Sequence, residues 1–258
     1  MAVKINRAGA RPSSAAGSLN VVQADGCVTV SLDRPAAGNR IAAAMADRLI
    51  ELAENVEDDD SIKLLAITGV GEAFCTGFEN DIDERLVESL AAVSKPTVAI
   101  INGDACDEGL ELALALDIRI AAARARFALT QLTRGAMPHF GGSQRLTRLI
   151  GSAQALKMIL TGTAIDGREA MRLGLVTYLA DGRSALERCA RETIQSMARR
   201  GPIAMRLAKE AVLKGFDMTL EQGIRLEEDL YALLQTTADR SEGVRAFLEK
   251  RRPLFKGV

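Results

Sequence analysis

The chain has 258 residues, 48% of them hydrophobic and 26% charged, which is typical of a globular protein that buries a sizeable core. Its net charge of -1 gives no electrostatic reason to expect nucleic acid or an anionic membrane surface as a partner, and no apolar run reaches the roughly 20 residues of a membrane span. The four cysteines lie far apart without a C-x-x-C pair, which favours reduced thiols and a cytoplasmic protein over a disulfide or zinc framework.

The first 18 residues are basic, rich in Ser and Ala, and free of acidic side chains. This composition is also found in transit peptides, but no clear amphipathic stripe accompanies it. We therefore expect residues 1–18 to form a flexible N-terminal tail.

Two β-rich segments come next, at residues 19–23 and 27–32, and the Ala-Asp-Gly between them predicts a hairpin. A helix with one apolar face is expected over residues 41–56, where an acidic run ends it. Residues 62–68 have the apolar composition of a buried strand.

The middle of the chain alternates strand and helix patterns. A glycine-punctuated stretch and a short polar helix precede a strand at residues 97–102, a helix that begins near Gly109, and a further strand at residues 118–121. This alternation favours an α/β fold with mainly parallel pairing. Because the units resemble one another, we expect a stacked ββα spiral core over residues 19–195.

The pattern is helical from about Ser184 onward. An Arg-Arg-Gly-Pro sequence ending at Pro202 separates two helical stretches, and Pro253 is expected to end the last one. We expect residues 196–258 to form a C-terminal helical subdomain. Such a subdomain serves oligomerisation or covers the core, and the sequence does not choose between the two.

Several segments, in this order and spacing, resemble the enoyl-CoA hydratase/isomerase (crotonase) family, and the likeness covers nearly the whole chain from residue 19. It begins at Lys-Pro-Thr-Val-Ala-Ile-Ile-Asn-Gly, residues 95–103. It continues through Gly-Leu-Glu-Leu-Ala-Leu-Ala-Leu-Asp (109–117), Gly-Gly-Ser-Gln-Arg-Leu-Thr-Arg (141–148) and Glu-Gly-Val-Arg-Ala-Phe-Leu-Glu-Lys-Arg-Arg-Pro (242–253).

The resemblance implies a crotonase-like ββα spiral assembled as a homotrimer or a dimer of trimers. It also implies an acyl-CoA thioester substrate, with coenzyme A as part of the substrate and no other cofactor or metal. Two backbone N–H groups of an oxyanion hole would hold the thioester oxygen, where enolate charge develops. By position these donors are Phe78 N–H, just after Gly77, and Glu108 N–H, before Gly109 at a helix N-terminus whose dipole adds to the bond.

The chain departs from the family at this entrance. Hydratases have a glycine-rich approach to the helix, where this chain has Asp107 and Glu108. Two carboxylates place negative charge close to the expected oxyanion. They oppose thioester activation unless they turn away or are protonated.

The catalytic pair also differs. Hydratases position water with two glutamates: Glu111 matches the first, and the second position holds Gln131. Glutamine orients a water but cannot accept its proton, so ordinary two-glutamate hydration is in doubt. The only histidine, His139, is either a surface residue or a general acid or base, since dehalogenase-like relatives carry a catalytic aspartate at this position.

Near the C-terminus, Lys250 and Arg251 resemble basic residues that meet CoA phosphates in the family, and a solvated helix end is the alternative. Three functions are compatible with these residues. The first is a hydratase or isomerase that uses Glu111 and His139 on an acyl-CoA enolate. The second is a hydrolase or decarboxylase of a β-dicarbonyl substrate that need not carry CoA, and the third is a catalytically degenerate binding subunit.

Overall fold

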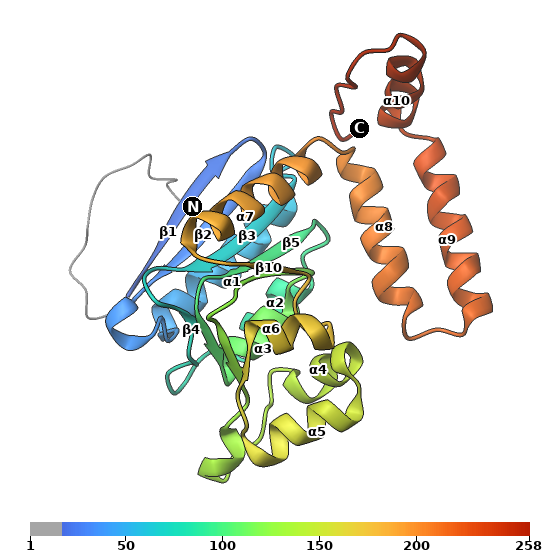
Figure 1. Ribbon diagram of the computed structural model, residues 1–258. Helices are drawn as coiled ribbons and strands as arrows, with labels where there is room; N and C mark the ends of the chain where they lie inside the picture. The colour runs from blue at the N-terminus through green and yellow to red at the C-terminus, as the bar shows by residue number, and fades with distance from the viewer. Residues whose placement is uncertain (1–16) are drawn as a thin grey trace.

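The computed structural model describes residues 17–258 (Figure 1). The tail predicted for residues 1–18 therefore lies almost entirely outside the described residues. The first strand begins at Ser18, one residue inside the predicted tail. Within residues 17–258, no helix is long and apolar enough to cross a membrane.

The larger sheet has six strands in the order β1-β2-β3-β5-β7-β10. The first two form the predicted antiparallel hairpin, whose turn residues Asp25 and Gly26 have φ of 51° and 76°, as a type I′ turn requires. The remaining neighbours pair in parallel, as expected. The strands are β1 (Ser18–Ala24), β2 (Cys27–Asp33), β3 (Leu64–Gly69), β5 (Thr97–Ile101), β7 (Ile118–Ala122) and β10 (Tyr178–Ala180).

The smaller sheet has the order β4-β6-β8-β9, with parallel pairing except at β9. Its strands are β4 (Ala73–Cys75), β6 (Asp104–Cys106), β8 (Arg126–Ala128) and β9 (Ile165–Asp166). Three successive units each give one strand to each sheet and then a helix: β3-β4-α2, β5-β6-α3 and β7-β8-η2. The stacked ββα spiral predicted from the sequence is confirmed.

Helices inside this spiral are α1 (Ala43–Asp58), α2 (Arg85–Ala91) and α3 (Glu108–Ala115), with 3-10 turns η1 (Pro35–Ala37) and η2 (Gln131–Arg134). The first helix begins two residues later than predicted. Ile41 instead forms an isolated bridge with Phe78, and this contact helps to position the candidate site.

Two apolar layers hold the larger sheet. One face packs against α1, α2 and α3, with fully buried side chains such as Leu49 and Ile67. The other face packs against α7 (Arg183–Ala198), where Leu64 and Ile120 meet Leu186. Truncation of a fully buried Leu or Ile to Ala destabilises by about 2–5 kcal/mol. Of the helices that follow, α6 (Gly167–Leu173) contacts β8 and β9 of the small sheet, α4 (Gly142–Ile150) packs against α3, and α5 (Ser152–Thr161) packs against α4.

An arm of three helices, residues 202–258, projects from this body (Figure 1). It consists of α8 (Pro202–Gly215), α9 (Leu220–Gln235) and α10 (Ala238–Leu248). The last helix ends five residues before Pro253, because Lys250 adopts a left-handed φ of 53° and Arg251 N–H bonds back to Ala246 O. The predicted break before Pro202 falls between α7 and α8.

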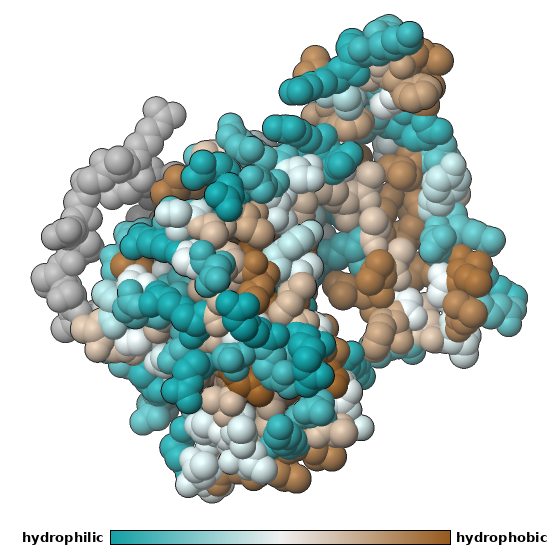
Figure 2. Space-filling view, in the orientation of Figure 1, coloured by the Kyte–Doolittle hydropathy of each residue, from teal (hydrophilic) through white to brown (hydrophobic). Residues whose placement is uncertain are grey.

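The arm exposes much of its apolar surface. No residue of α8 is buried, and α9 buries only Leu230. Figure 2 shows brown, hydrophobic side chains along the arm. Leu220 of α9 and Phe247 of α10 are 81% and 82% exposed. The body holds the arm through Lys209, whose ammonium pairs with Asp117 at 2.7 Å and donates to Val93 O.

Candidate functional site

Phe78 lies where the chain leaves β4, and its backbone is held by Ile41. The N–H of Ile41 donates to Gly77 O at 3.1 Å, and the N–H of Glu79 donates to Ile41 O at 2.8 Å. Gly77 has φ of 136°, a conformation that favours glycine. The Gly77 turn and the Ile41 bridge together fix the backbone around the Phe78 N–H group, the first predicted oxyanion donor.

The second predicted donor lies at the start of α3, which begins at Glu108. The first N–H groups of a helix have no intrahelical acceptor and carry the positive end of its dipole. Gly109 lets this end approach β4, because a Cβ added there would lie 2.0 Å from Cys75 O. Gly109 therefore acts through close packing rather than through a side chain.

The Asp107 carboxylate points away from this entrance. It is buried and accepts hydrogen bonds from Thr130 N–H at 2.5 Å, from the Thr130 hydroxyl at 2.9 Å and from Arg134 Nη1 at 2.9 Å. The backbone of Asp107 has φ of 50° and ψ of -125°, a strained conformation for a residue with a Cβ. The three contacts hold this conformation. Thr130 and Arg134 were not identified from the sequence, because neither belongs to a recognisable motif.

Glu108 behaves differently. Its Oε2 accepts a hydrogen bond from Phe78 N–H at 3.3 Å, and its Oε1 lies 4.0 Å from Arg134 Nη2. The carboxylate thus lies against the donor that the sequence assigns to the thioester oxygen. A carboxylate close to the expected oxyanion opposes thioester activation. This applies to Glu108, and it does not apply to Asp107, whose carboxylate points away.

Glu111, at the position that the resemblance assigns to the first catalytic glutamate, is fully buried one turn into α3. Its Oε1 accepts from the backbone N–H groups of Phe140 at 2.9 Å and Gly142 at 2.8 Å. Burial raises the pKa of the Glu111 carboxyl, the two backbone N–H groups oppose this rise, and the charge of Glu108 adds to it. A buried carboxyl with a raised pKa suits proton transfer.

Gln131 lies beside Glu111 and is also buried. Its Nε2 donates to Glu111 Oε2 at 3.2 Å. Its Oε1 is the one buried side-chain N or O atom without a partner that is found within residues 17–258. The two positions that the resemblance aligns with the catalytic pair are thus brought into contact, with one acceptor of the pair unsatisfied.

His139 is exposed and lies one residue before Phe140. Its ring contacts the Phe140 ring at a centroid distance of 4.2 Å, and Phe140 in turn meets Phe78 edge to face at 5.2 Å. The polar contact found for the imidazole is Nδ1 with Met137 O at 3.4 Å. His139 therefore lies at the edge of the site, and it reaches Glu111 only through its charge, which lowers the pKa of that carboxyl.

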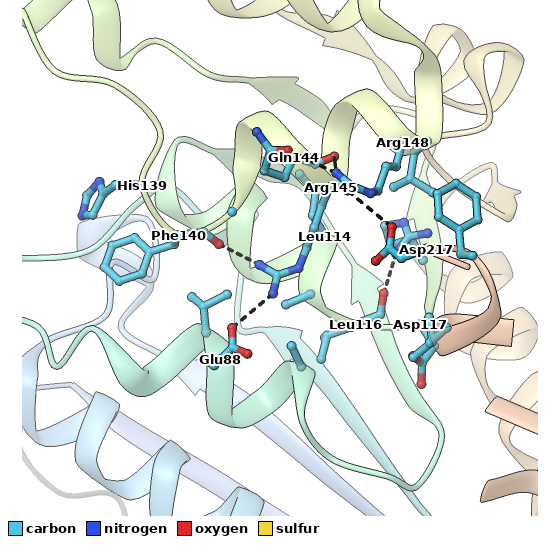
Figure 3. A pocket seen from close by; sticks show the side chains of 18 of the residues that line it. Glu88, Leu114, Leu116, Asp117, His139, Phe140, Gln144, Arg145, Arg148 and Asp217 are labelled. Carbon is cyan, nitrogen blue, oxygen red and sulfur yellow. Dashed lines mark hydrogen bonds and ion pairs between the residues drawn. The ribbon is translucent and has the colours of Figure 1, made fainter. Parts of the chain in front are cut away.

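A cavity of about 830 Å³ extends from His139 and Phe140 to the α8–α9 turn at Phe216 and Asp217 (Figure 3). Its walls combine apolar side chains of α2, α3 and α4 with the guanidinium groups of Arg145 and Arg148. Arg145 donates to Phe140 O and pairs with Glu88 on the facing helix. The cavity adjoins the site through Phe140, whose N–H donates to Glu111, while Glu111, Phe78 and Glu108 do not line it.

Lys250 and Arg251 follow α10 at the far end of the arm from α3 (Figure 1). Arg251 pairs with Glu242 at 2.6 Å and with Glu249 at 2.5 Å, so its charge is compensated within the arm. Within one chain, the structure does not bring these two side chains to the site around Glu111. No cluster of three or more His, Cys, Asp or Glu side chains that could hold a metal is present in the described part of the chain.

The whole fold matches solved structures. The crystal structure of an enoyl-CoA hydratase from Bacillus anthracis superimposes with a TM-score of 0.89 at 35% identity, covering 93% of this chain and 99% of that one. An enoyl-CoA hydratase from Mycobacterium tuberculosis gives a TM-score of 0.88 at 28% identity, with 93% and 99% coverage. Two sheets in a ββα spiral, followed by C-terminal helices, define the crotonase fold.

The sequence matches as well. The family model described as enoyl-CoA hydratase/isomerase covers residues 23–258. The 2,3-dehydroadipyl-CoA hydratase of Escherichia coli (strain K12) is 38% identical over 241 residues, which are 88% of this chain and 94% of the relative. The (E)-benzylidenesuccinyl-CoA hydratase of Thauera aromatica is 38% identical over 244 residues, or 89% and 95%. The chain belongs to the enoyl-CoA hydratase/isomerase family of enzymes.

Proposed function

We propose that the protein hydrates 2-enoyl-CoA thioesters through an enolate that the N–H groups of Phe78 and Glu108 stabilise. The observation that carries this proposal is the environment of Glu111. Its carboxylate is buried, oriented by two backbone N–H groups and Gln131, and located one turn behind the helix N-terminus that would hold the thioester oxygen. Oriented donors in a site that excludes water stabilise developing negative charge strongly.

In this reaction the oxygen of water attacks C3 of the substrate while Glu111 takes one proton from the water. The C2=C3 electron pair moves toward the thioester, and negative charge forms on its oxygen. The enolate then takes the proton from Glu111 at C2, so that the hydroxyl ends on C3 and the proton on C2. Gln131 Oε1 accepts a hydrogen bond from the water and orients it, since a glutamine cannot take its proton.

The names of two relatives support hydration over isomerisation. Both the Escherichia coli and the Thauera aromatica proteins are named as hydratases of CoA thioesters. Gln131 Oε1, a buried acceptor with no protein partner among residues 17–258, supports a bound water at the same place. His139, at the edge of the cavity, is the second candidate for proton transfer.

The test is a panel of trans-2-enoyl-CoA substrates, assayed by loss of the ultraviolet absorption of the conjugated thioester. We expect hydration by the wild-type protein and a loss of at least about 100-fold in Glu111→Gln. Equal rates for the two proteins would contradict the role of Glu111. Tight acyl-CoA binding without turnover would indicate a binding subunit. If the protein turns over β-dicarbonyl compounds and neither converts CoA thioesters nor is inhibited by them, the hydrolase alternative is indicated.

We further propose that the arm assembles the protein into a homotrimer or a dimer of trimers. The exposed apolar side chains of the arm support this, because burial of each large one contributes about 1.5–3 kcal/mol. Assembly would also allow Lys250 and Arg251 to reach CoA phosphates on a neighbouring copy. The four cysteines are free thiols, which supports a cytoplasmic location.

A further inference from the structure

The carboxylate of Glu108 and a thioester oxygen compete for one hydrogen-bond donor. Glu108 Oε2 lies 3.3 Å from Phe78 N, and the Glu108 side chain is only 13% exposed, so it is packed into the entrance rather than extended into solvent. A Cβ built on Gly77 would lie 2.8 Å from the same oxygen, which shows how closely the carboxylate fits against the β4 exit. A substrate oxygen bound to this N–H requires Glu108 to move.

The structure also provides a place for the displaced carboxylate. Arg134 Nη2 is 4.0 Å from Glu108 Oε1, just beyond hydrogen-bond distance, while Arg134 Nη1 is anchored on Asp107 at 2.9 Å. The Arg134 side chain is 54% exposed, and a guanidinium carries five N–H donors. A small rotation of the Glu108 side chain toward Arg134 would bring this ion pair within hydrogen-bond distance and release Phe78 N–H.

The other cation close to this carboxylate is already engaged. The Arg40 guanidinium also lies against Gly77, but it donates to the backbone oxygens of Phe78 and Thr76. Glu111 is the neighbouring anion, and the charge of Glu108 raises its pKa. Movement of Glu108 toward Arg134 would therefore also reduce the negative charge beside the forming oxyanion.

We propose that Glu108 determines ligand specificity by competing with the thioester oxygen for the Phe78 N–H group, and that Arg134 receives the Glu108 carboxylate when an acyl-CoA binds. The inference rests on the proposed function, since it assumes a thioester at the Phe78 and Glu108 N–H groups. Competition at Phe78 N–H affects some ligands and not others. A ligand whose oxygen binds to the Phe78 N–H group must displace the Glu108 carboxylate, and a ligand without that oxygen need not.

Two ligands separate these cases in calorimetric titrations of the 258-residue protein. Butyryl-CoA carries the thioester oxygen, and its thioether analogue S-butyl-CoA lacks only that oxygen. In Glu108→Ala we expect butyryl-CoA to bind about tenfold more tightly than in the wild type, because a charge-assisted hydrogen bond no longer competes. We expect the affinity for S-butyl-CoA to stay within about twofold. Glu108→Gln, which keeps the shape but not the charge, should change the affinities in the same direction.

Glu88→Ala is the matched control. Glu88 is an exposed acid on the wall of the cavity that adjoins the site at Phe140, so its removal also takes away one negative charge without touching Phe78. We expect it to change the affinities for both ligands equally. An equal gain for butyryl-CoA and S-butyl-CoA in Glu108→Ala would mean simple charge repulsion of CoA and would overturn the inference.

The role of Arg134 is tested by a double-mutant cycle. We expect Arg134→Ala to weaken butyryl-CoA binding about fivefold more when Glu108 is present than in the Glu108→Ala background, because the lost Asp107 contact is common to both backgrounds and the displaced carboxylate is present only in the first. An equal loss of affinity with and without Glu108 would refute the assigned role of Arg134. If neither ligand binds to any variant, the proposed function fails first and this inference with it. If butyryl-CoA binds the wild type and Glu108→Ala equally well, only the inference fails.

Discussion

The side-chain amide of Gln131 donates a hydrogen bond to the Glu111 carboxylate at 3.2 Å, and both side chains are buried. This contact fixes the amide so that Gln131 Oε1 faces away from the carboxylate and has no protein partner within residues 17–258. A buried acceptor without a partner costs about 1–3 kcal/mol. The pair therefore combines one ionisable group with one neutral acceptor, where two-glutamate hydratases have two ionisable groups.

Replacement of Gln131 by Glu should move the pH dependence of catalysis. A second carboxylate removes a donor to Glu111 and adds a like charge, and both changes raise the pKa of Glu111 further. Because Glu111 must be ionised to take a proton from water, the rising limb of kcat/KM against pH should shift to higher pH. The matched variant Gln131→Leu has no charge, and we expect it to lower kcat about tenfold or more at every pH. An unshifted limb in Gln131→Glu would contradict the assignment of Glu111 as base.

The Glu111→Gln variant should become more stable relative to the wild type as the pH rises. The folded-state pKa of Glu111 is raised by burial above its ordinary value of 4.5, so the unfolded chain ionises first as the pH rises. The wild type loses stability from about pH 4.5 until the pH passes the raised value, and the amide variant has no such loss. Gln131 can turn its free Oε1 toward the new amide and satisfy it. Urea denaturation at pH 4.5 and pH 8 measures the difference, which should grow in favour of Glu111→Gln. If the stability of the variant minus that of the wild type is smaller at pH 8 than at pH 4.5, the ionised Glu111 carboxylate stabilises the fold.

Gly142→Ala should impair catalysis more than stability. A Cβ at this position would lie 2.8 Å from Glu111 Cγ and Oε1, so the carboxylate must shift. We expect hydration to fall about tenfold or more and stability by about 1–3 kcal/mol. Gly182→Ala is a suitable control, because its φ of 86° gives a similar loss of stability of about 1–2 kcal/mol in open space at the start of α7. If both variants retain full activity, the position of Glu111 is not critical.

Charge placed on the arm should prevent assembly. Leu220→Asp combined with Phe247→Asp puts two carboxylates at the most exposed apolar positions of the arm, neither of which lines the cavity. Sedimentation velocity should give a monomer for this variant and a trimer or hexamer for the wild type. The control Leu160→Asp changes an apolar side chain that is 65% exposed on α5 and should leave the assembly intact. If the wild-type protein sediments as a monomer, the proposal that the arm assembles it into a trimer or hexamer is wrong.

Much of the fold follows from local pattern. The Asp25-Gly26 turn, the parallel strands and the helical C-terminal region were all predicted, because hydrophobic periodicity and turn residues report directly on local structure. The limits of α1 and α10 were less accurate. Ile41 looks helical by pattern but pairs with Phe78, and the left-handed Lys250 ends α10 ahead of Pro253. Contacts between distant segments decide such ends.

The site was predictable only where the resemblance supplied positions. The spacing of Glu111 and Gln131 located both residues, but the hydrogen bond between them and the unpaired Oε1 needed coordinates. The different directions of the Asp107 and Glu108 side chains were not predictable. They depend on Thr130 and Arg134, which follow 20 or more residues later. Side-chain direction at a helix start is set by tertiary neighbours, and no local pattern encodes them.

The central claim is that Glu111 moves a proton at C2 of an acyl-CoA whose oxygen is held by Phe78 and Glu108 N–H. It is tested most directly by deuterium exchange into butyryl-CoA, a saturated thioester that cannot be hydrated, followed by mass spectrometry in D₂O. We predict that the wild type incorporates deuterium at C2 and that Glu111→Gln does so at least about 100-fold more slowly while still binding the ligand. Exchange at equal rates in both proteins, or no exchange by a wild type that binds butyryl-CoA, would contradict the claim.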